Sequence, residues 1–162
     1  MDRKIILFGC GIIGHEALER LGKDNVLCFC DNDISLHGTS RWGKDIVSLE
    51  YIKNNYSGFV ILICARIDKA YHIACQLDEN GIFNYWCYPI IEKDLQDCGS
   101  GRVLEFLYNK DLMVEKQIKL YRDKISKLEK QLDYMKIHSD IKTLKPATGA
   151  LRKRQMELTD LG

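Results

Sequence analysis

The 162-residue sequence predicts an α/β fold, in which a small parallel sheet is followed by a long C-terminal helix with the pattern of a coiled coil. Two observations support this prediction. Up to about residue 98, short apolar runs alternate with amphipathic segments of helical spacing, which is typical of a parallel sheet with crossover helices. From residue 111 onward, apolar residues recur with heptad spacing instead.

Each expected strand is a short apolar run that ends at a turn residue. The run 5–8 ends at Gly9, the run 26–30 ends at Asp31, and the run 59–64 is the clearest of all. Continuous runs of this kind, rich in β-branched residues, are typical of strands buried on both faces. Shorter extended pieces are expected at 46–47 and 85–88, helices at 15–21, 49–54 and 69–79, and a loop around Gly38 and Gly43.

The composition is that of a globular protein, with 46% hydrophobic and 29% charged residues. Residues 1–109 carry 11 Lys and Arg against 15 Asp and Glu, whereas residues 110–162 carry 13 against 8. This asymmetry indicates two structural units. The apolar stretch near the N-terminus is too short for a signal peptide or a membrane span, so we expect no membrane insertion.

The seven cysteines form no CxxC pair and are odd in number. Several lie within apolar runs, as Cys28 and Cys30 do, where free cysteine behaves as a small hydrophobic residue. Neither a zinc site nor a disulfide framework is expected from this pattern. The sequence therefore predicts a cytoplasmic location and no metal site.

A glycine-rich loop follows the first strand and opens the first helix. Gly9 permits a tight turn, Gly11 lets a pyrophosphate approach the backbone, and Gly14 lets the helix pack closely on the strand. A phosphate would then face unpaired N–H groups and the positive end of the helix dipole. We expect a Rossmann-like nucleotide site formed by Gly9, Cys10, Gly11, Ile12, Ile13 and Gly14.

Residues after the second and third buried strands complete the expected site. Asp31 stands where an acid accepts hydrogen bonds from ribose hydroxyls and disfavours a 2′-phosphate, although Asp31, Asn32 and Asp33 also fit an ordinary turn. Arg66 is placed to pair with a phosphate or to be a surface arginine. The predicted cofactor-binding residues are therefore the loop 9–14, Asp31, Asn32 and Arg66.

Two further loop residues have alternative interpretations. His15, in the first turn of the loop helix, either touches a phosphate or is a solvated surface residue. Cys10 is either a reactive thiol, if its pKa is lowered, or a small residue that only fills space in the loop. No Tyr-x-x-x-Lys pair, nucleophile elbow or lysine-ended phosphate loop is present, so no catalytic residue is predicted.

The rear of the chain has the pattern of a coiled coil. Isoleucine at one core position and leucine at the other favour a parallel two-stranded coil, with Lys124 able to meet Glu129 of a partner chain. We expect a homodimer through residues 114–135, with a helix folded back on its own domain or on a missing neighbour as the alternative, and no nucleic-acid partner. A hinge is expected at 99–101 and a helix break at 143–146, because the residue before Pro146 avoids helical angles. The seam residues are Val114, Ile118, Tyr121, Ile125, Leu128, Leu132 and Met135.

The front of the chain resembles the nucleotide-sugar-binding N-terminal domain of PglD-type sugar acyltransferases, which also precedes LicD-family domains. The segments KIILFGCG at 4–11, CDND at 30–33, WG at 42–43 and VSLE at 47–50 carry this resemblance. Residues 140–149 and 151–158 look like the lead-in to a LicD domain, a family that transfers phosphocholine or related groups onto cell-surface polysaccharide. The carboxylate-rich catalytic region of that family would follow residue 162.

The resemblance implies three domains or segments: 1–98 a nucleotide-binding domain, 99–139 a coiled-coil helix and 140–162 the lead-in to a LicD-like domain. The expected function is a nucleotide- or nucleotide-sugar-binding accessory domain of a LicD-like transferase, without catalysis of its own. NAD, a UDP-sugar and CDP-choline are the candidate ligands. The alternatives are an NAD-dependent oxidoreductase or epimerase of sugar nucleotides, and a structural dimerisation module that binds nothing.

Overall fold

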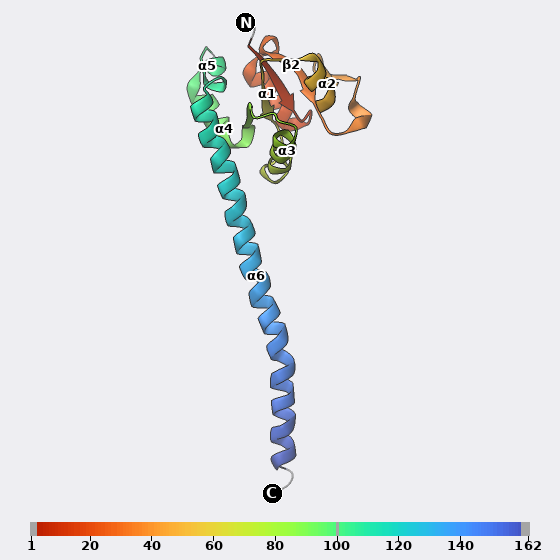
Figure 1. Ribbon diagram of the computed structural model, residues 1–162, viewed down its shortest axis with the longest axis vertical. Helices are drawn as coiled ribbons and strands as arrows, with labels where there is room; N and C mark the ends of the chain where they lie inside the picture. The colour runs from red at the N-terminus through yellow and green to blue at the C-terminus, as the bar shows by residue number, and fades with distance from the viewer. Residues whose placement is uncertain (1–2, 100, 160–162) are drawn as a thin grey trace. The chain divides into compact units, whose positions relative to one another are not determined.

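The computed structural model of the chain comprises two compact units, Met1–Tyr121 and Arg122–Gly162. It describes the backbone of residues 3–99 and 101–159, and the side chains of residues 3–99 and 101–140. The first unit is a layered α/β structure and the second is part of a single helix (Figure 1). The predicted fold class is confirmed.

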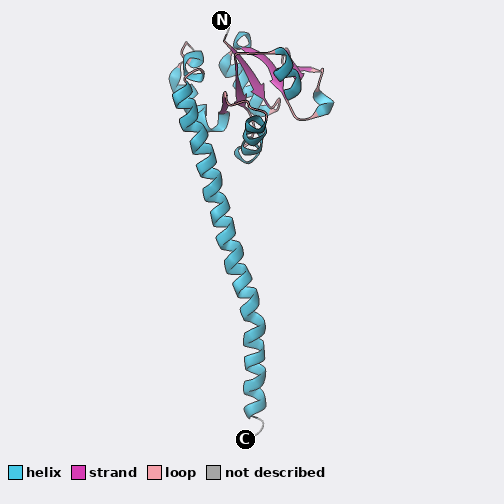
Figure 2. Ribbon diagram, viewed as in Figure 1, coloured by secondary structure: helices cyan, strands magenta, loops and turns pink. Residues whose placement is uncertain are grey.

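A six-stranded sheet forms the middle layer of the first unit (Figure 2), in the order β3-β4-β2-β1-β5-β6. All neighbours pair in parallel except β3 and β4, which are antiparallel. The central strand β1 is paired along its whole length with β5, from Lys4 opposite Phe59 to Phe8 opposite Ile63. The strands are β1 (Lys4–Phe8), β2 (Val26–Cys30), β3 (Ser40–Arg41), β4 (Lys44–Val47), β5 (Phe59–Ile63) and β6 (Tyr85–Cys87).

Alternate residues of each central strand enter two separate cores. Ile5 and Leu7 of β1 belong to one apolar cluster, whereas Ile6 and Phe8 belong to the other. The first cluster is covered by α1, α4 and α5, and the second by α2 and α3. This double burial explains why these strands read as continuous apolar runs. The helices are α1 (Ile12–Leu21), α2 (Leu49–Asn55), α3 (Ile67–Glu79), α4 (Tyr88–Cys98), α5 (Val103–Leu107) and α6 (Lys110–Thr159), with short 3-10 turns at Lys23–Asn25 and Ile34–Leu36.

The first unit continues past the glycine-rich segment at 99–101. Val103 and Leu107 of α5 are buried in the first core, and so is Met113 of α6. The indole Nε1 of Trp86 donates a hydrogen bond of 2.8 Å to the carbonyl of Leu107. The start of α6 therefore packs as part of the α/β unit up to Tyr121.

Two local predictions are wrong. The segment around Gly43, expected as a loop, forms the β3–β4 hairpin at the edge of the sheet, and β4 includes the extended piece expected at 46–47. The helix break at 143–146 does not occur, because α6 continues through Pro146 to Thr159 (Figure 1). The fixed φ of proline is compatible with a helix, although inside a helix proline removes a backbone hydrogen bond and its ring crowds the carbonyl four residues earlier, at a cost of about 3 kcal/mol. The side chains of the lead-in segment from residue 141 lie outside the described residues.

Within its described part, the chain has no helix that combines the length and the apolar character needed to cross a lipid bilayer.

Candidate functional site

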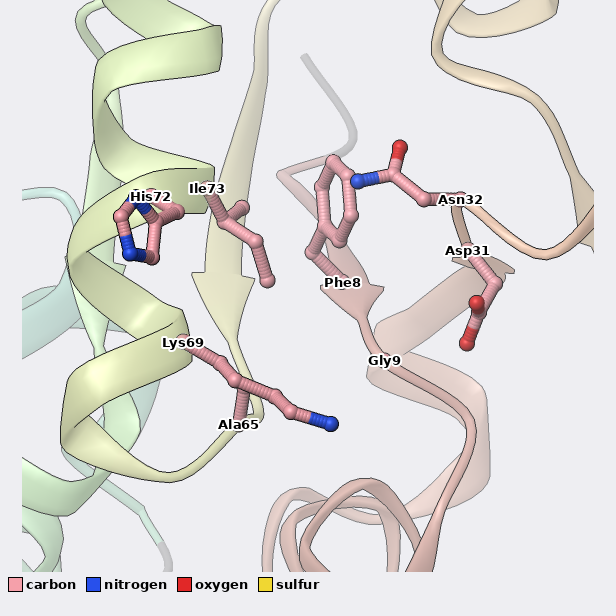
Figure 3. A pocket seen from close by; sticks show the side chains of 8 residues that line it. All are labelled: Phe8, Gly9, Asp31, Asn32, Ala65, Lys69, His72 and Ile73. Carbon is pink, nitrogen blue, oxygen red and sulfur yellow. The ribbon is translucent and has the colours of Figure 1, made fainter.

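A cavity lies at the carboxyl ends of the central strands, where the strand order reverses. β1 has β2 on one side and β5 on the other, and in sheets of this type ligands bind in the crevice outside such a reversal point. The cavity has a volume of about 360 Å³. Its lining comes from the ends of β1, β2 and β5 and from α3 (Figure 3): Phe8, Gly9, Asp31, Asn32, Ala65, Lys69, His72 and Ile73.

Two of the three loop glycines are required by packing. Gly9 has φ +111°, and a Cβ there would lie 2.5 Å from the carbonyl oxygen of Cys64. A Cβ on Gly14 would lie 2.1 Å from the carbonyl oxygen of Gly9. Gly11 differs, since a Cβ there would meet no atom within 4 Å. The space in front of Gly11 is thus open to a ligand, as the sequence predicts for a backbone that receives a phosphate.

Asp31 lies beside the glycine loop and is bound to it. Its Oδ2 accepts hydrogen bonds from the backbone N–H of Cys10, at 3.1 Å, and from the Cys10 thiol, at 3.2 Å. Its Oδ1 accepts from the N–H of Asp33 at 3.0 Å. Burial alone would raise the pKa of Asp31, but these hydrogen bonds outweigh burial and lower it. Asp31 is therefore an ionised carboxylate that organises the loop and keeps part of its hydrogen-bonding capacity.

Cys10 is buried in the glycine loop, and its thiol has a raised pKa. Burial, followed by the hydrogen bond to Asp31 and the charge of that carboxylate, raises the pKa of the thiol to about 11. A thiol with this pKa stays protonated near neutral pH and is a poor nucleophile. This raised pKa favours the packing interpretation of Cys10 over the reactive one.

Asn32 and Lys69 face each other across the cavity. Asn32 exchanges two hydrogen bonds with Gln76 of α3, its Nδ2 donating at 2.8 Å and its Oδ1 accepting at 3.0 Å. The ammonium group of Lys69 points toward the space beside Gly9 (Figure 3). Among the described residues no carboxylate forms an ion pair with Lys69. Sequence analysis missed Lys69, although a cation in the first turn of the helix after β5 is a usable signal.

Arg66 lies apart from Asp31 and Asn32. Its side chain is 78% exposed and pairs with Asp68 at 3.4 Å. With Ile13 it borders a second cavity, of about 410 Å³, between α1, α3 and α4. Ile12, also a predicted site residue, is 87% exposed at the start of α1.

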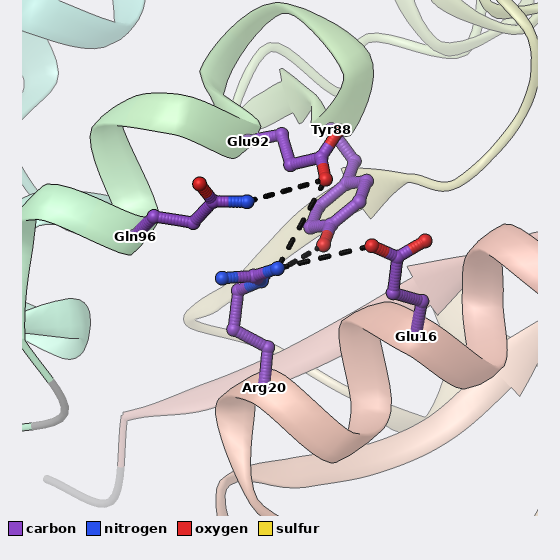
Figure 4. A network of polar contacts seen from close by, with 5 residues as sticks. All are labelled: Glu16, Arg20, Tyr88, Glu92 and Gln96. Atoms are coloured by element: carbon purple, nitrogen blue, oxygen red, sulfur yellow. Dashed lines mark hydrogen bonds and ion pairs between the residues drawn. The ribbon is translucent and has the colours of Figure 1, made fainter.

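A polar network joins α1 to α4 beside this second cavity (Figure 4). The Nε of Arg20 donates to the hydroxyl of Tyr88 at 3.0 Å. The Nη2 of Arg20 lies 3.8 Å from Glu16 and 3.9 Å from Glu92, and Gln96 donates to Glu92 at 3.5 Å. Glu16, Tyr88 and Glu92 also line the cavity, so the network holds two helices that border it.

The β3–β4 hairpin reaches the glycine loop from the sheet edge. The Nη1 of Arg41 donates to the carbonyl of Cys10 at 3.1 Å. The indole of Trp42 stacks on the ring of His15, with centroids 4.3 Å apart and planes at 20°. His15 therefore has an aromatic neighbour, and its own ring also approaches Glu19 at 3.8 Å. Neither contact of the hairpin was visible in the sequence, because the hairpin itself was not predicted.

The chain matches no family model and no curated protein. Among solved structures, it is similar to the crystal structure of UDP-D-quinovosamine 4-dehydrogenase from Vibrio fischeri, with 23% sequence identity and a TM-score of 0.38. The similarity covers 49% of this chain and 73% of that chain. The assignment of a Rossmann-like fold depends on the strand order and pairing of the chain itself.

Proposed function

We propose that the first unit binds a nucleotide or nucleotide sugar at the carboxyl ends of β1, β2 and β5. The observation that carries this proposal is the 360 Å³ cavity at the reversal of strand order, which has Gly9 and Asp31 on one side and Lys69 on the other. A glycine loop, an acid at the end of the second strand and a lysine on the facing helix form a site suited to a phosphorylated ribose.

The glycine loop would hold the phosphates. The first N–H groups of α1 have no acceptor within the helix, and they carry the positive end of its dipole. Gly11, Ile12 and Ile13 are the residues through which these groups would contact a phosphate, in the open space before Gly11. Lys69 would add a positive charge from the opposite wall.

Asp31, Asn32 and Arg66 would contact other parts of the ligand. Asp31 accepts three hydrogen bonds from the protein and retains a lone pair for a ribose hydroxyl. Asn32 would contact the ligand after its hydrogen bonds with Gln76 break. Arg66 would do so after its ion pair with Asp68 breaks. NAD, a UDP-sugar and CDP-choline all contain the phosphorylated ribose that this arrangement fits.

Gly11→Val tests the site directly. The new side chain would fill the open space before the loop without meeting a protein atom, so the fold should tolerate it while a phosphate should not. Gly101→Val is the matched control, since Gly101 also has open space around its Cβ position but lies between α4 and α5, outside the glycine loop. The measurement is calorimetric binding of UDP-N-acetylglucosamine, CDP-choline and NAD to both variants and the wild type.

We expect the wild type to bind at least one ligand, and a hundredfold excess over Kd to stabilise it by about 2.7 kcal/mol. Gly11→Val should weaken that binding by at least about tenfold, the effect of losing one charge-assisted contact, and Gly101→Val should not. If millimolar concentrations of all three ligands leave the wild type unbound, the proposal is wrong. Equal binding by wild type and Gly11→Val would place the ligand away from the loop.

We also propose that this binding domain is an accessory part of a LicD-like transferase that modifies cell-surface polysaccharide. The support is the resemblance of residues 140–158 to the lead-in of that family. Incubation with NAD and UDP-sugars tests the competing oxidoreductase or epimerase function, which predicts NADH or an epimer as product.

Self-association is proposed for α6. Residues 114–135 form the proposed interface, and four apolar side chains of the second unit are between 48% and 66% exposed there: Ile125, Leu128, Leu132 and Met135. Within the described residues this unit contains only part of α6, so these side chains lack an intramolecular core. An apolar stripe at heptad spacing is typically covered by a second helix.

A further inference from the structure

The peptide bonds around Cys10 are held from two sides by opposite charges. The N–H of Cys10 donates to the carboxylate of Asp31 at 3.1 Å, and the C=O of Cys10 accepts from the guanidinium of Arg41 at 3.1 Å. Asp31 comes from the end of β2, and Arg41 comes from the hairpin at the sheet edge. Two separate elements thus determine how the start of the glycine loop is oriented.

This orientation decides which groups the loop presents. In a trans peptide the C=O and the following N–H point in opposite directions. Because the Cys10 carbonyl points to Arg41, the N–H of Gly11 points away from the guanidinium. In the same way, the Cys10 N–H points to Asp31 and the Gly9 carbonyl points the other way, where it lies against Gly14. The loop carbonyls are therefore occupied or packed, while N–H groups remain for an anion.

The hairpin that carries Arg41 is held in place at some cost in backbone strain. The two residues of its turn, Trp42 and Gly43, have φ of +51° and +79°, as the two-residue turns of hairpins require. Tryptophan rarely adopts such a φ, and such residues persist where the surroundings hold them. Here Trp42 stacks on His15 and meets the edge of Phe29, with centroids 5.7 Å apart. These contacts keep Arg41 beside the loop.

We propose that Arg41 is a positioning residue of the phosphate-binding loop, and that the β3–β4 hairpin is part of the binding site. This inference rests on the proposed function and names a residue that decides the affinity for phosphate. Without the guanidinium, the Cys10 carbonyl loses its donor and the peptide can rotate. A carbonyl turned toward the ligand repels a phosphate, while the Gly11 N–H is withdrawn from it.

Arg41→Met tests this role, because it keeps the aliphatic chain and removes both the donor and the charge. Lys44→Met is the matched control, since Lys44 pairs with Arg41 across the hairpin, whereas the hydrogen bond to the Cys10 carbonyl comes from Arg41. Arg41→Lys restores a donor and a charge. The probes are UDP, CDP and ADP, each compared with its nucleoside by calorimetry, and the thermal midpoint of each ligand-free variant is measured alongside.

We expect Arg41→Met to weaken binding of the preferred diphosphate by about tenfold, the effect of one hydrogen bond from a charged group. Binding of the matching nucleoside should be unchanged, and the thermal midpoint of the free protein should fall only by the few degrees that one lost hydrogen bond costs. Lys44→Met should bind within about twofold of the wild type, and Arg41→Lys should lie between wild type and Arg41→Met.

Diphosphate binding by Arg41→Met that equals the wild type overturns the inference and leaves the proposed function intact. An equal loss in Lys44→Met overturns it too, because the effect would then be one of overall charge. If Arg41→Lys binds no better than Arg41→Met, the role through the carbonyl is wrong. A wild type that binds none of the three diphosphates overturns the proposed function, and this inference with it.

Discussion

Tyr121 donates its hydroxyl hydrogen to the carboxylate of Asp78 and thereby joins α6 to α3. The hydroxyl of Tyr85 lies 3.2 Å from that of Tyr121, and the amide of Gln117 donates to the carbonyls of Phe83 and Tyr85, at 2.9 Å each. Tyr121 was placed in the heptad seam by its spacing, yet its polar end is used inside the α/β unit. The helix is attached here by polar contacts rather than by apolar packing alone.

Tyr121→Phe should lower the free energy of unfolding of the protein by about 1–2 kcal/mol, because the ring is kept and a hydrogen bond to a charged acceptor is lost. Urea unfolding followed by circular dichroism measures this change. Tyr134→Phe, on an exposed part of the same helix, is the control and should have no effect above about 0.5 kcal/mol. A value for Tyr121→Phe equal to that control would show that the contact contributes nothing to stability.

Alkaline pH should destabilise the protein through its buried thiols. Burial, and then the nearby charge of Asp45, raises the pKa of Cys28 from 9.0 to about 12. Between these two values the unfolded thiol has lost its proton while the folded one keeps it, so the unfolded state binds fewer protons and stability falls as pH rises. The stabilisation that the protonated Cys28 thiol gives to the folded state is fully present below pH 9 and is lost as the pH rises above it.

Urea unfolding in reductant at pH 7.5, 9 and 10 should therefore show a decline, with up to about 1.4 kcal/mol per pH unit from each such thiol. Cys28→Ala should reduce that slope. Val26→Ala, a buried neighbour on the same strand without a titratable group, should lower stability equally at every pH. If Cys28→Ala keeps the full dependence of stability on pH, the Cys28 thiol has the same pKa in the folded and the unfolded state.

The central strands could be predicted from the sequence because both their faces are buried. Phe8 and Ile63 end apolar runs that have no other interpretation in a globular chain of this size. The β3–β4 hairpin could not be predicted, since Ser40 and Arg41 are exposed and its turn is Trp-Gly in place of the usual Asn-Gly. At Pro146 a local rule failed, because the bias of the preceding residue against helical angles is a preference and not a prohibition, and α6 continues through it.

The candidate site was predictable where its signals are local in the sequence. The glycine spacing and the position of Asp31 at a strand end are local signals, and the structure brings this loop and this carboxylate together. The contact of Arg41 with Cys10 joins residues 31 positions apart through an unforeseen hairpin. No periodicity or motif records such a contact. Arg66 was correctly placed at the sheet edge, but its pairing with Asp68 depends on rotamers that spacing does not reveal.

Gly14→Ala should destabilise the protein even in the absence of ligand. A Cβ at this position would lie 2.1 Å from the carbonyl oxygen of Gly9 and 3.2 Å from the ring of Phe29, so α1 must move away from the sheet. Overpacking of this kind costs about 1–3 kcal/mol. Gly11→Ala is the control with open space, and thermal and urea unfolding of the two variants compare them. Equal stability of both variants would contradict the close approach of α1 to the loop.

The apolar seam of α6 provides the last prediction. Ile125→Glu combined with Leu132→Glu places two charges on the seam, and it should convert a dimer into a monomer because like charges would meet across the interface. The matched control combines Lys119→Glu with Lys130→Glu. At about 100° per residue these positions lie on the opposite side of the helix from the seam, so the same substituents should leave a dimer intact.

Sedimentation equilibrium at several protein concentrations measures the mass of each form. A wild type that stays monomeric at 100-micromolar concentration, roughly the range in which a weak coiled coil associates, would exclude self-association through this seam. If both double variants dissociate alike, overall charge and not the seam controls the assembly. Dissociation restricted to the seam variant places the interface on Ile125 and Leu132.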